Sequence, residues 1–285
     1  MKIVKFLGGL GNQMFQYAFY LFLKQHFRTV KADIIGFADY SLHNGFELEH
    51  VFGIRLRLAS PLEIRVYTPE RSDWATRKLR RLYGAKNAWY PEKSEFSYDR
   101  LITGDKRSRY YWGYWQHYHY IKDIEPQLRE NFQFREGLKG ENRKLLNQVS
   151  GLETVSLHVR RGDYIGHPLL GGICELDYYR EAIVRIKKEL QDPVFIVFSD
   201  DISWCKNSLP LANAVYVNWN TGRDNYLDMQ LMSRCRHHII ANSSFSWWGA
   251  WLNNYEGKKV IAPGKWVNLP GNDSTGLLPP NWTRI

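Results

Sequence analysis

The segment HVRRGDY, residues 158 to 164, places two adjacent arginines and an aspartate where an apolar strand is expected to end. Alternation in residues 154 to 159 puts the valines and the leucine on one face and leaves His158 and Arg160 together on the other. Guanidinium groups bind phosphate oxygens through charge-assisted, often bidentate hydrogen bonds. Arg160 and Arg161 point to opposite sides of the strand end. We therefore expect one of them to meet an anionic ligand and the other to pair with Asp163 or anchor the loop.

A second segment, NSSFSWW at residues 242 to 248, has the features of a helix start that binds phosphate. Ser243 or Ser244 can cap the helix, whose first turn presents free backbone N–H groups and the positive end of the helix dipole. The alternative is an ordinary capped helix with its tryptophans in the core. Combined with the arginines of residues 158 to 164, this segment predicts a diphosphate clamp.

Three further groups of residues each have more than one possible role. Asp200 and Asp201 follow an apolar run, and they could bind a ribose, a base or a metal, or cap the next helix through an Asx turn. His158 could donate a hydrogen bond to a ligand or be a satisfied structural residue. The loop GGLGNQ, residues 8 to 13, has only a weak likeness to a dinucleotide fingerprint. A glycine loop still lets a substrate approach the backbone closely, so substrate contacts are expected at Gly9, Gly11, Asn12 and Gln13.

A repeated pattern of strand then helix must position these segments. Nearly all-apolar strands that alternate with helical stretches predict parallel sheets covered on both faces. Strands are expected at 3–7, 30–35, 154–159, 193–198, 214–218, 237–241 and 258–262, and helices at 14–27, 177–190, 202–208, 224–235 and 244–254. Residues 36 to 150 show no clear order beyond a polar helical stretch from 121. A boundary near 150 predicts two α/β domains, 1–150 and 151–285, with a cleft between them.

The composition limits the class of protein and its partners. A net charge of +10 favours an anionic partner, which could be nucleic acid, a membrane surface or a phosphorylated substrate. The basic runs at 71–81 and 106–109 are either solvated faces or membrane contacts, and no nucleic-acid-binding fold signature accompanies them. Three scattered cysteines predict neither disulfides nor a zinc site. No apolar run is long enough to cross a bilayer, so a cytoplasmic protein is expected.

Several motifs in one order resemble the α-1,2-fucosyltransferases of glycosyltransferase family 11. The resemblance runs from residue 8 to about 266 and rests on GGLGNQMFQYAF, FELEHVFGI, GYWQHYHYI, HVRRGDY, FSDDISWCK and DMQLMSRCRHHIIANSSFSWWGAWL. It implies a GT-B-type α/β fold with two Rossmann-like domains facing a central cleft. It also implies a GDP-fucose donor bound mainly by the C-terminal domain, with the N-terminal domain on the acceptor side. Fucose would be transferred to the 2-hydroxyl of a galactose with inversion of configuration at its C1 atom. The resemblance implies no metal or other cofactor.

The resemblance also assigns roles to particular residues. Arg160 would contact the β-phosphate of the donor, and Arg161 and Asp163 would support its loop, so Arg160 and Asp163 form the expected catalytic set. Asp163, His167 and Glu175 are the open candidates for a base that accepts the proton of the acceptor hydroxyl. The remaining expected donor contacts lie near the β-phosphate or the nucleoside, at His158, Asp200, Asp201, Asp228, Asn242, Ser243, Ser244 and Phe245.

Two other functions compete with this expectation. One is a GDP-fucose-dependent transferase of a different linkage, and the other is a non-catalytic carbohydrate-binding protein. A lectin needs no diphosphate clamp, which argues against the second. The expected partners are GDP-fucose and a galactose-terminated oligosaccharide or lipid-linked glycan, as in O-antigen or oligosaccharide biosynthesis, with peripheral membrane contact and no nucleic acid. Acceptor identity and oligomeric state are not set by the sequence.

Overall fold

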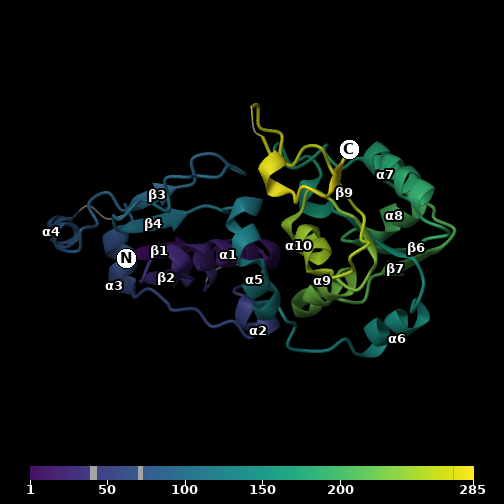
Figure 1. Cartoon of the computed structure of the whole chain (residues 1–285), viewed down its shortest axis with the longest axis horizontal. Coiled ribbons are helices and arrows are strands. Elements are labelled where there is room, and N and C mark those ends of the chain that lie inside the picture. Colours follow the sequence, from purple (N-terminus) through teal and green to yellow (C-terminus); the bar gives the residue numbers. More distant parts are fainter. Residues whose placement is uncertain (39–43, 70–72, 272) are drawn as a thin grey trace. The chain divides into compact units, whose positions relative to one another are not determined.

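The chain folds into two compact units, each built on one parallel sheet (Figure 1). The computed structural model describes residues 1–38, 44–69, 73–271 and 273–285. The first unit comprises Met1–Gln133 and Asp273–Leu278, and the second comprises Phe134–Asn272 and Pro279–Ile285. The division therefore falls earlier than the boundary expected near residue 150.

Residues 134 to 150 join the second unit because they pack on its sheet. This segment contains α6 (Gly140–Gln148), and its Leu138 and Leu145 share a buried cluster with Ile196 and Phe198 of the second sheet. Burying these leucines removes apolar surface from water, which fixes the segment to that sheet. A polar sequence stretch alone did not reveal the two inward-facing leucines.

The first unit has four strands in the order β2 (Val30–Asp33), β1 (Lys2–Lys5), β4 (Arg109–Trp112) and β3 (Trp89–Pro91), all parallel. Helix α1 (Leu10–His26) connects β1 to β2, which gives the predicted strand, helix and strand order. The first fourteen residues of α1 are buried except Asn12. An apolar surface around most of a helix is typical of a helix covered on several sides.

Two of the remaining helices of the first unit, α3 (Pro61–Tyr67) and α4 (Trp74–Leu82), begin at local caps that the periodicity did not reveal. Ser60 and Glu63 form a reciprocal capping box, and Asp73 accepts a hydrogen bond from the Thr76 amide. Such caps satisfy backbone groups that the helix itself leaves unpaired. The unit also contains α2 (Leu48–Phe52) and α5 (Glu125–Asn131). Of the basic run at 71–81, residues 71 and 72 lie outside the described residues and the rest is largely α4.

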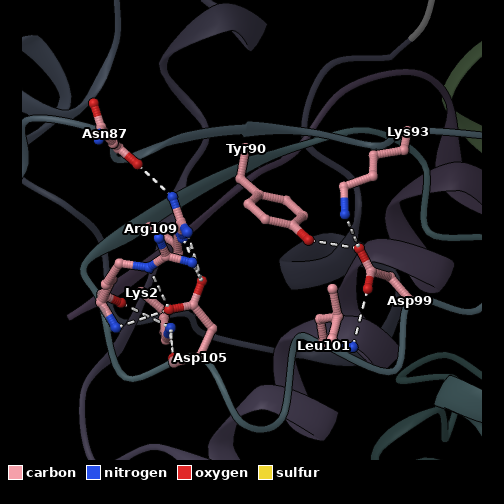
Figure 2. A network of polar contacts seen from close by, with 9 residues as sticks. Lys2, Asn87, Tyr90, Lys93, Asp99, Leu101, Asp105 and Arg109 are labelled. Carbon is pink, nitrogen blue, oxygen red and sulfur yellow. Dashed lines mark hydrogen bonds and ion pairs between the residues drawn. The ribbon is translucent and has the colours of Figure 1, made fainter.

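Part of the basic charge of the first unit is used to hold its sheet together. Figure 2 shows Lys2 of β1 and Arg109 of β4 converging on Asp105. The Lys2 Nζ donates to the Asp105 carbonyl at 2.5 Å and to the Arg107 carbonyl at 2.8 Å, and the Arg109 Nε donates to the Asp105 carboxylate at 2.6 Å. Burial lowers the pKa of Lys2 to about 8. These cations serve the fold and not an external anion.

The second unit has six strands in the order β10 (Thr283–Arg284), β9 (Val260–Ala262), β8 (His237–Ile239), β5 (Thr154–Val159), β6 (Val194–Ser199) and β7 (Ala214–Val217). All pairs are parallel. One face packs on α7 (Leu176–Glu189) and α8 (Ile202–Ser208), and the other on α6 and α9 (Tyr226–Met232). Helix α10 (Ser244–Leu252) follows β8 and packs on α9.

Both units therefore show the predicted α/β class with parallel sheets. The strand ranges expected after residue 150 agree with the observed ones within two residues, and β5 and α8 agree at both ends. Among the described residues, no helix combines the length and the apolar character needed to span a bilayer.

Candidate functional site

Three neighbouring strands of the second sheet carry the polar segments that the sequence singled out. Strand β5 lies between β6 and β8, and the register pairs Val159 with Ser199 and Leu157 with Ile239. Because the strands are parallel, their carboxyl ends lie at one edge of the sheet. The loops that begin at Arg160, Asp200 and Asn242 therefore leave the sheet from the same edge.

The Arg160 side chain is held between two carboxylates. Its Nη2 lies 2.7 Å from Oδ1 of Asp163, and its Nη1 lies 3.0 Å from Oδ2 of Asp200. The guanidinium also lies over the Tyr164 ring, 5.5 Å from the centroid. About a third of the side chain is exposed, at 31%. The arrangement gives a cation of fixed orientation that is still open to an incoming anion.

Arg161 anchors the loop through different atoms. Its backbone N–H donates to Oδ1 of Asp200 at 2.9 Å, and its Nε donates to Oδ2 of Asp201 at 3.4 Å. The guanidinium lies 4.1 Å from the ring centroid of Trp204 on α8. These contacts turn the Arg161 side chain toward α8, while Arg160 faces its two carboxylates.

Asp200 and Asp201 act on the arginines and on α8. One oxygen of Asp200 meets the Arg160 guanidinium and the other accepts the Arg161 amide. Asp201 caps α8 by accepting the Trp204 amide at 2.9 Å. Helix capping was one of the roles considered for these two aspartates, and Asp201 has that role. In this structure Asp200 is an organiser of the arginine loop.

Gly162 is a site residue that the sequence analysis missed. A Cβ built on Gly162 would lie 2.7 Å from Oδ2 of Asp200, which is closer than real Cβ contacts occur. The residue has no left-handed φ, so the reason for glycine is close approach and not backbone conformation. The only sequence signal was its place directly after the arginine pair.

The segment after β8 combines a buried anchor with a helix start. The side-chain amide of Asn242 donates to the carbonyls of Leu170 and Trp266 at 3.1 Å each. The backbone carbonyl of Asn242 accepts a hydrogen bond from the Tyr164 hydroxyl at 3.3 Å. Ser243 is the N-cap residue of α10, and Ser244 is the first residue of the helix. The tryptophans of α10 lie in the core, as the alternative of an ordinary capped helix predicted. The buried residues are Trp247, Trp248 and Trp251.

His158 is buried beside Arg160 with one ring nitrogen unused. It is 7% exposed, and among the described residues its Nδ1 has no hydrogen-bond partner. Burial, assisted by the charge of Arg160, lowers its pKa to about 3, so the imidazole is neutral. Its ring centroid lies 6.1 Å from that of Phe245 at the start of α10. A satisfied structural histidine, the alternative considered above, is not what the structure shows.

Asp228 takes part in a different network. It lies on α9 and accepts a hydrogen bond from the Asn220 Nδ2 at 2.7 Å, and Asn220 in turn bonds Asn142. Burial raises the pKa of Asp228 to about 7. No described contact joins Asp228 to the arginine loop, so a direct nucleoside contact remains a prediction.

The four N-terminal candidates belong to the first unit. Gly9 precedes α1, Gly11 is buried in its first turn, and Asn12 accepts the Gln116 side chain at 2.8 Å. Gln13 is fully buried and donates to the carbonyls of Gly8 and Gly45 while accepting the Glu47 amide. In this structure the Gln13 amide therefore holds together the loops around the start of α1.

Comparison with known proteins decides the family. The family model described as glycosyl transferase family 11 matches residues 1–285. The chain belongs to glycosyltransferase family 11. An α-1,2-colitosyltransferase of Escherichia coli is 34% identical over 293 residues, which cover 99% of this chain and 98% of that protein. The galactoside 2-α-L-fucosyltransferase Sec1 of Mus musculus is 27% identical over 263 residues, covering 88% and 64%.

Solved structures agree on the fold of this family 11 glycosyltransferase. The fucosyltransferase NodZ from Bradyrhizobium has a TM-score of 0.52 at 16% identity, and the match covers 88% of this chain and 93% of that one. Another NodZ structure, an α-1,6-fucosyltransferase co-crystallised with GDP, has the same TM-score and covers 88% and 92%. The fold is therefore of the GT-B type, as the resemblance implied, and the protein is a glycosyltransferase of family 11.

Glycosyl transfer raises the question of which group accepts the proton of the acceptor hydroxyl. Of the three candidates, His167 uses its Nδ1 to accept the amides of Leu169 and Leu170, at 3.1 and 3.2 Å. Its neutral form therefore carries the proton on Nε2, which leaves no free lone pair for a base. Asp163 is exposed but paired with Arg160, and Glu175 is exposed at the start of α7. This family 11 chain thus uses His167 to shape the loop.

Proposed function

We propose that this protein is an inverting α-1,2-fucosyltransferase, which moves L-fucose from GDP-β-L-fucose to the 2-hydroxyl of a galactose in an oligosaccharide or glycolipid. The observation that carries the proposal is Arg160, a partly exposed cation fixed by Asp163 and Asp200 at the strand edge from which α10 also begins. The mouse relative named as a galactoside 2-α-L-fucosyltransferase supports the reaction, and the GDP bound to NodZ supports the nucleotide.

The chemistry follows from charge. When the bond between fucose C1 and the β-phosphate oxygen breaks, negative charge develops on GDP and positive character on the sugar ring. Attack by the galactose 2-hydroxyl on the opposite face forms the new C1–O bond, inverts C1 and releases a proton. Cationic and N–H donors that are already in position stabilise this transition state more than the bound substrate. We assign that role to Arg160 and to the first turn of α10, and the proposal includes no metal.

A second donor is favoured by one observation, the 34% identity to an α-1,2-colitosyltransferase over nearly the whole chain. Colitose is fucose without its 3-hydroxyl, so both donors would fit the same diphosphate clamp. A site built to hydrogen-bond that hydroxyl would discriminate strongly against colitose, whereas an apolar surround would discriminate weakly. Both donors are therefore compared experimentally.

The deciding experiment offers GDP-fucose and GDP-colitose separately to a panel of β-galactosides, with EDTA present, and determines the linkage of each product. We expect an α-1,2 product from GDP-fucose. If the protein prefers GDP-colitose, the proposed α-1,2 linkage stands and colitose replaces fucose as the transferred sugar. Absence of any product, together with absence of GDP binding by calorimetry, would refute the proposal.

The clamp has a test of its own. Arg160→Ala should lower kcat by about 100-fold or more, which is the usual cost of removing a donor that meets developing charge. Far-UV circular dichroism and the unfolding temperature of the variant should stay near those of the parent protein. Turnover close to the parent value would show that Arg160 does not act on the leaving group.

A further inference from the structure

Helix α4 presents an exposed face that combines apolar and basic side chains. Trp74 at its start is 69% exposed and Leu82 at its end is 80% exposed. Arg77, Lys78 and Arg81 are exposed between them. At 100° per residue these five positions fall within about 140° of the helix circumference. They form one continuous surface, here called the α4 face.

The opposite side of α4 fixes this orientation. Thr76 is buried and accepts the Arg65 Nε at 3.1 Å, and Arg80 donates to the backbone carbonyls of Val66 and Thr68. The side chain of Asp73 caps the helix. Figure 1 shows α4 beside α3 and away from α1. The α4 face is therefore directed outward by packing and hydrogen bonds on the other side of the helix.

Among the described residues, the cations of the α4 face have no acidic partner. Arg77, Lys78 and Arg81 form no ion pair within the described parts of the chain, whereas the exposed Lys139 and Lys144 each pair with a neighbouring glutamate. Lys78 instead lies over the Trp74 ring, with its Nζ 5.4 Å from the centroid. The face thus carries three uncompensated positive charges beside two exposed apolar groups.

We infer that the α4 face docks on an anionic phospholipid surface. Tryptophan and leucine side chains have a lower free energy at the boundary between headgroups and acyl chains than in water. Long basic side chains on the same helix can reach the lipid phosphates. Charge complementarity selects an anionic bilayer over a neutral one. A nucleic acid would use the three cations but would leave Leu82 without an apolar partner. This surface lies outside the proposed catalytic clamp and adds a membrane partner to the protein.

The test compares vesicles of phosphatidylcholine with vesicles that also contain phosphatidylglycerol, using flotation of the full chain. We expect binding to the anionic vesicles only, weakened by added salt. The triple variant R77Q/K78Q/R81Q should lower the partition coefficient by about 100-fold, because each basic residue near an anionic surface strengthens binding several-fold. W74S/L82S should also weaken binding, and its effect should survive at high salt.

Matched substitutions on α7 separate local contact from general charge. R185Q/K187Q/K188Q removes the same three charges from another exposed helix, and Val184→Ser removes an exposed apolar side chain there. Both controls should bind anionic vesicles like the parent chain. The inference would be overturned if the α4 and α7 variants lost binding equally, or if the parent chain did not bind anionic vesicles. It would also be overturned if α4 gave affinity for single-stranded RNA without vesicle binding. Thermal unfolding of every variant establishes that it is folded.

Discussion

At the scale of single residues, the arginine loop is organised by the carboxylate of Asp200. Asp200 divides its two oxygens between the Arg160 guanidinium and the Arg161 backbone amide. The close approach of Gly162 makes this double contact fit. Aspartates after a strand are often interpreted as ligand contacts, yet here the charge serves to hold another charge in place. The orientation of the Arg160 guanidinium therefore depends on Asp200 and on the absence of a side chain at Gly162.

Gly162→Ala should disrupt this arrangement without removing any charged group. The added Cβ would lie 2.7 Å from Asp200 Oδ2, so the carboxylate must move and release one or both arginines. We expect kcat to fall by about 10-fold to 100-fold, because a shift of about 1 Å near the reacting groups has effects of this size. Steady-state kinetics with GDP-fucose or GDP-colitose, whichever the parent protein uses, measures the fall in kcat.

Gly137→Ala is the matched control for that substitution. Gly137 lies in the same unit, has a negative φ and has nothing within 4 Å of a built Cβ. Its alanine variant should keep parent kinetics and stability. If Gly162→Ala also keeps parent kinetics, Asp200 does not position the arginines during catalysis.

At the scale of elements, α1 shows how a buried polar side chain can fix a loop. The Gln13 amide is satisfied three times, by two carbonyls and one backbone N–H. Gln13→Leu would leave these three groups unpaired, two of them in buried contacts, which should lower the free energy of unfolding by roughly 3 kcal/mol. Urea denaturation measures the change. Gln25→Leu, an exposed position on the same helix, should change it by no more than about 0.5 kcal/mol. A similar small change at Gln13 would mean that water satisfies the freed groups.

Elements were predictable where burial dominates and unpredictable where caps and side-chain contacts dominate. The parallel strand β5 is fully buried, and its apolar residues Val155, Leu157 and Val159 alternate with polar ones, so its limits follow from the residues alone. Helices α3 and α4 depend on the Ser60 and Asp73 caps, and the strands β3 and β4 are short and rich in rings, so periodicity carries little information there. In the site, the strand-end rule predicted which loops meet. It could not predict that Asp200 binds both arginines, since that contact joins residues about forty positions apart.

At the scale of the whole molecule, buried groups with shifted pKa values set the response to acid. Burial lowers the pKa of His158 to about 3, that of His117 to about 4 and that of His238 well below its usual value. Each stays neutral in the folded state while its unfolded counterpart takes up a proton below about pH 6.5. Stability from these histidines is present above about pH 6.5 and is lost as the pH falls toward 3. Burial acts oppositely on Glu92 and Asp228, whose pKa values rise to about 7.

Between about pH 4.5 and 6.5 the two sets of groups partly cancel. Buried histidines give the unfolded state extra protons, and buried carboxyls with raised pKa values give the folded state extra protons. Each group that binds one proton more in one state than in the other changes the stability by about 1.4 kcal/mol per pH unit. Asp228→Asn removes one opposing carboxyl, so stability should fall by about 1.4 kcal/mol more per pH unit of acidification than in the parent chain. Asp177→Asn, at an exposed position, should leave the slope unchanged. Urea unfolding followed by tryptophan fluorescence at several pH values measures both slopes. Equal slopes for Asp228→Asn and the parent chain would mean that the Asp228 carboxyl is ionised in the folded protein at pH 5, despite its burial beside Asn220.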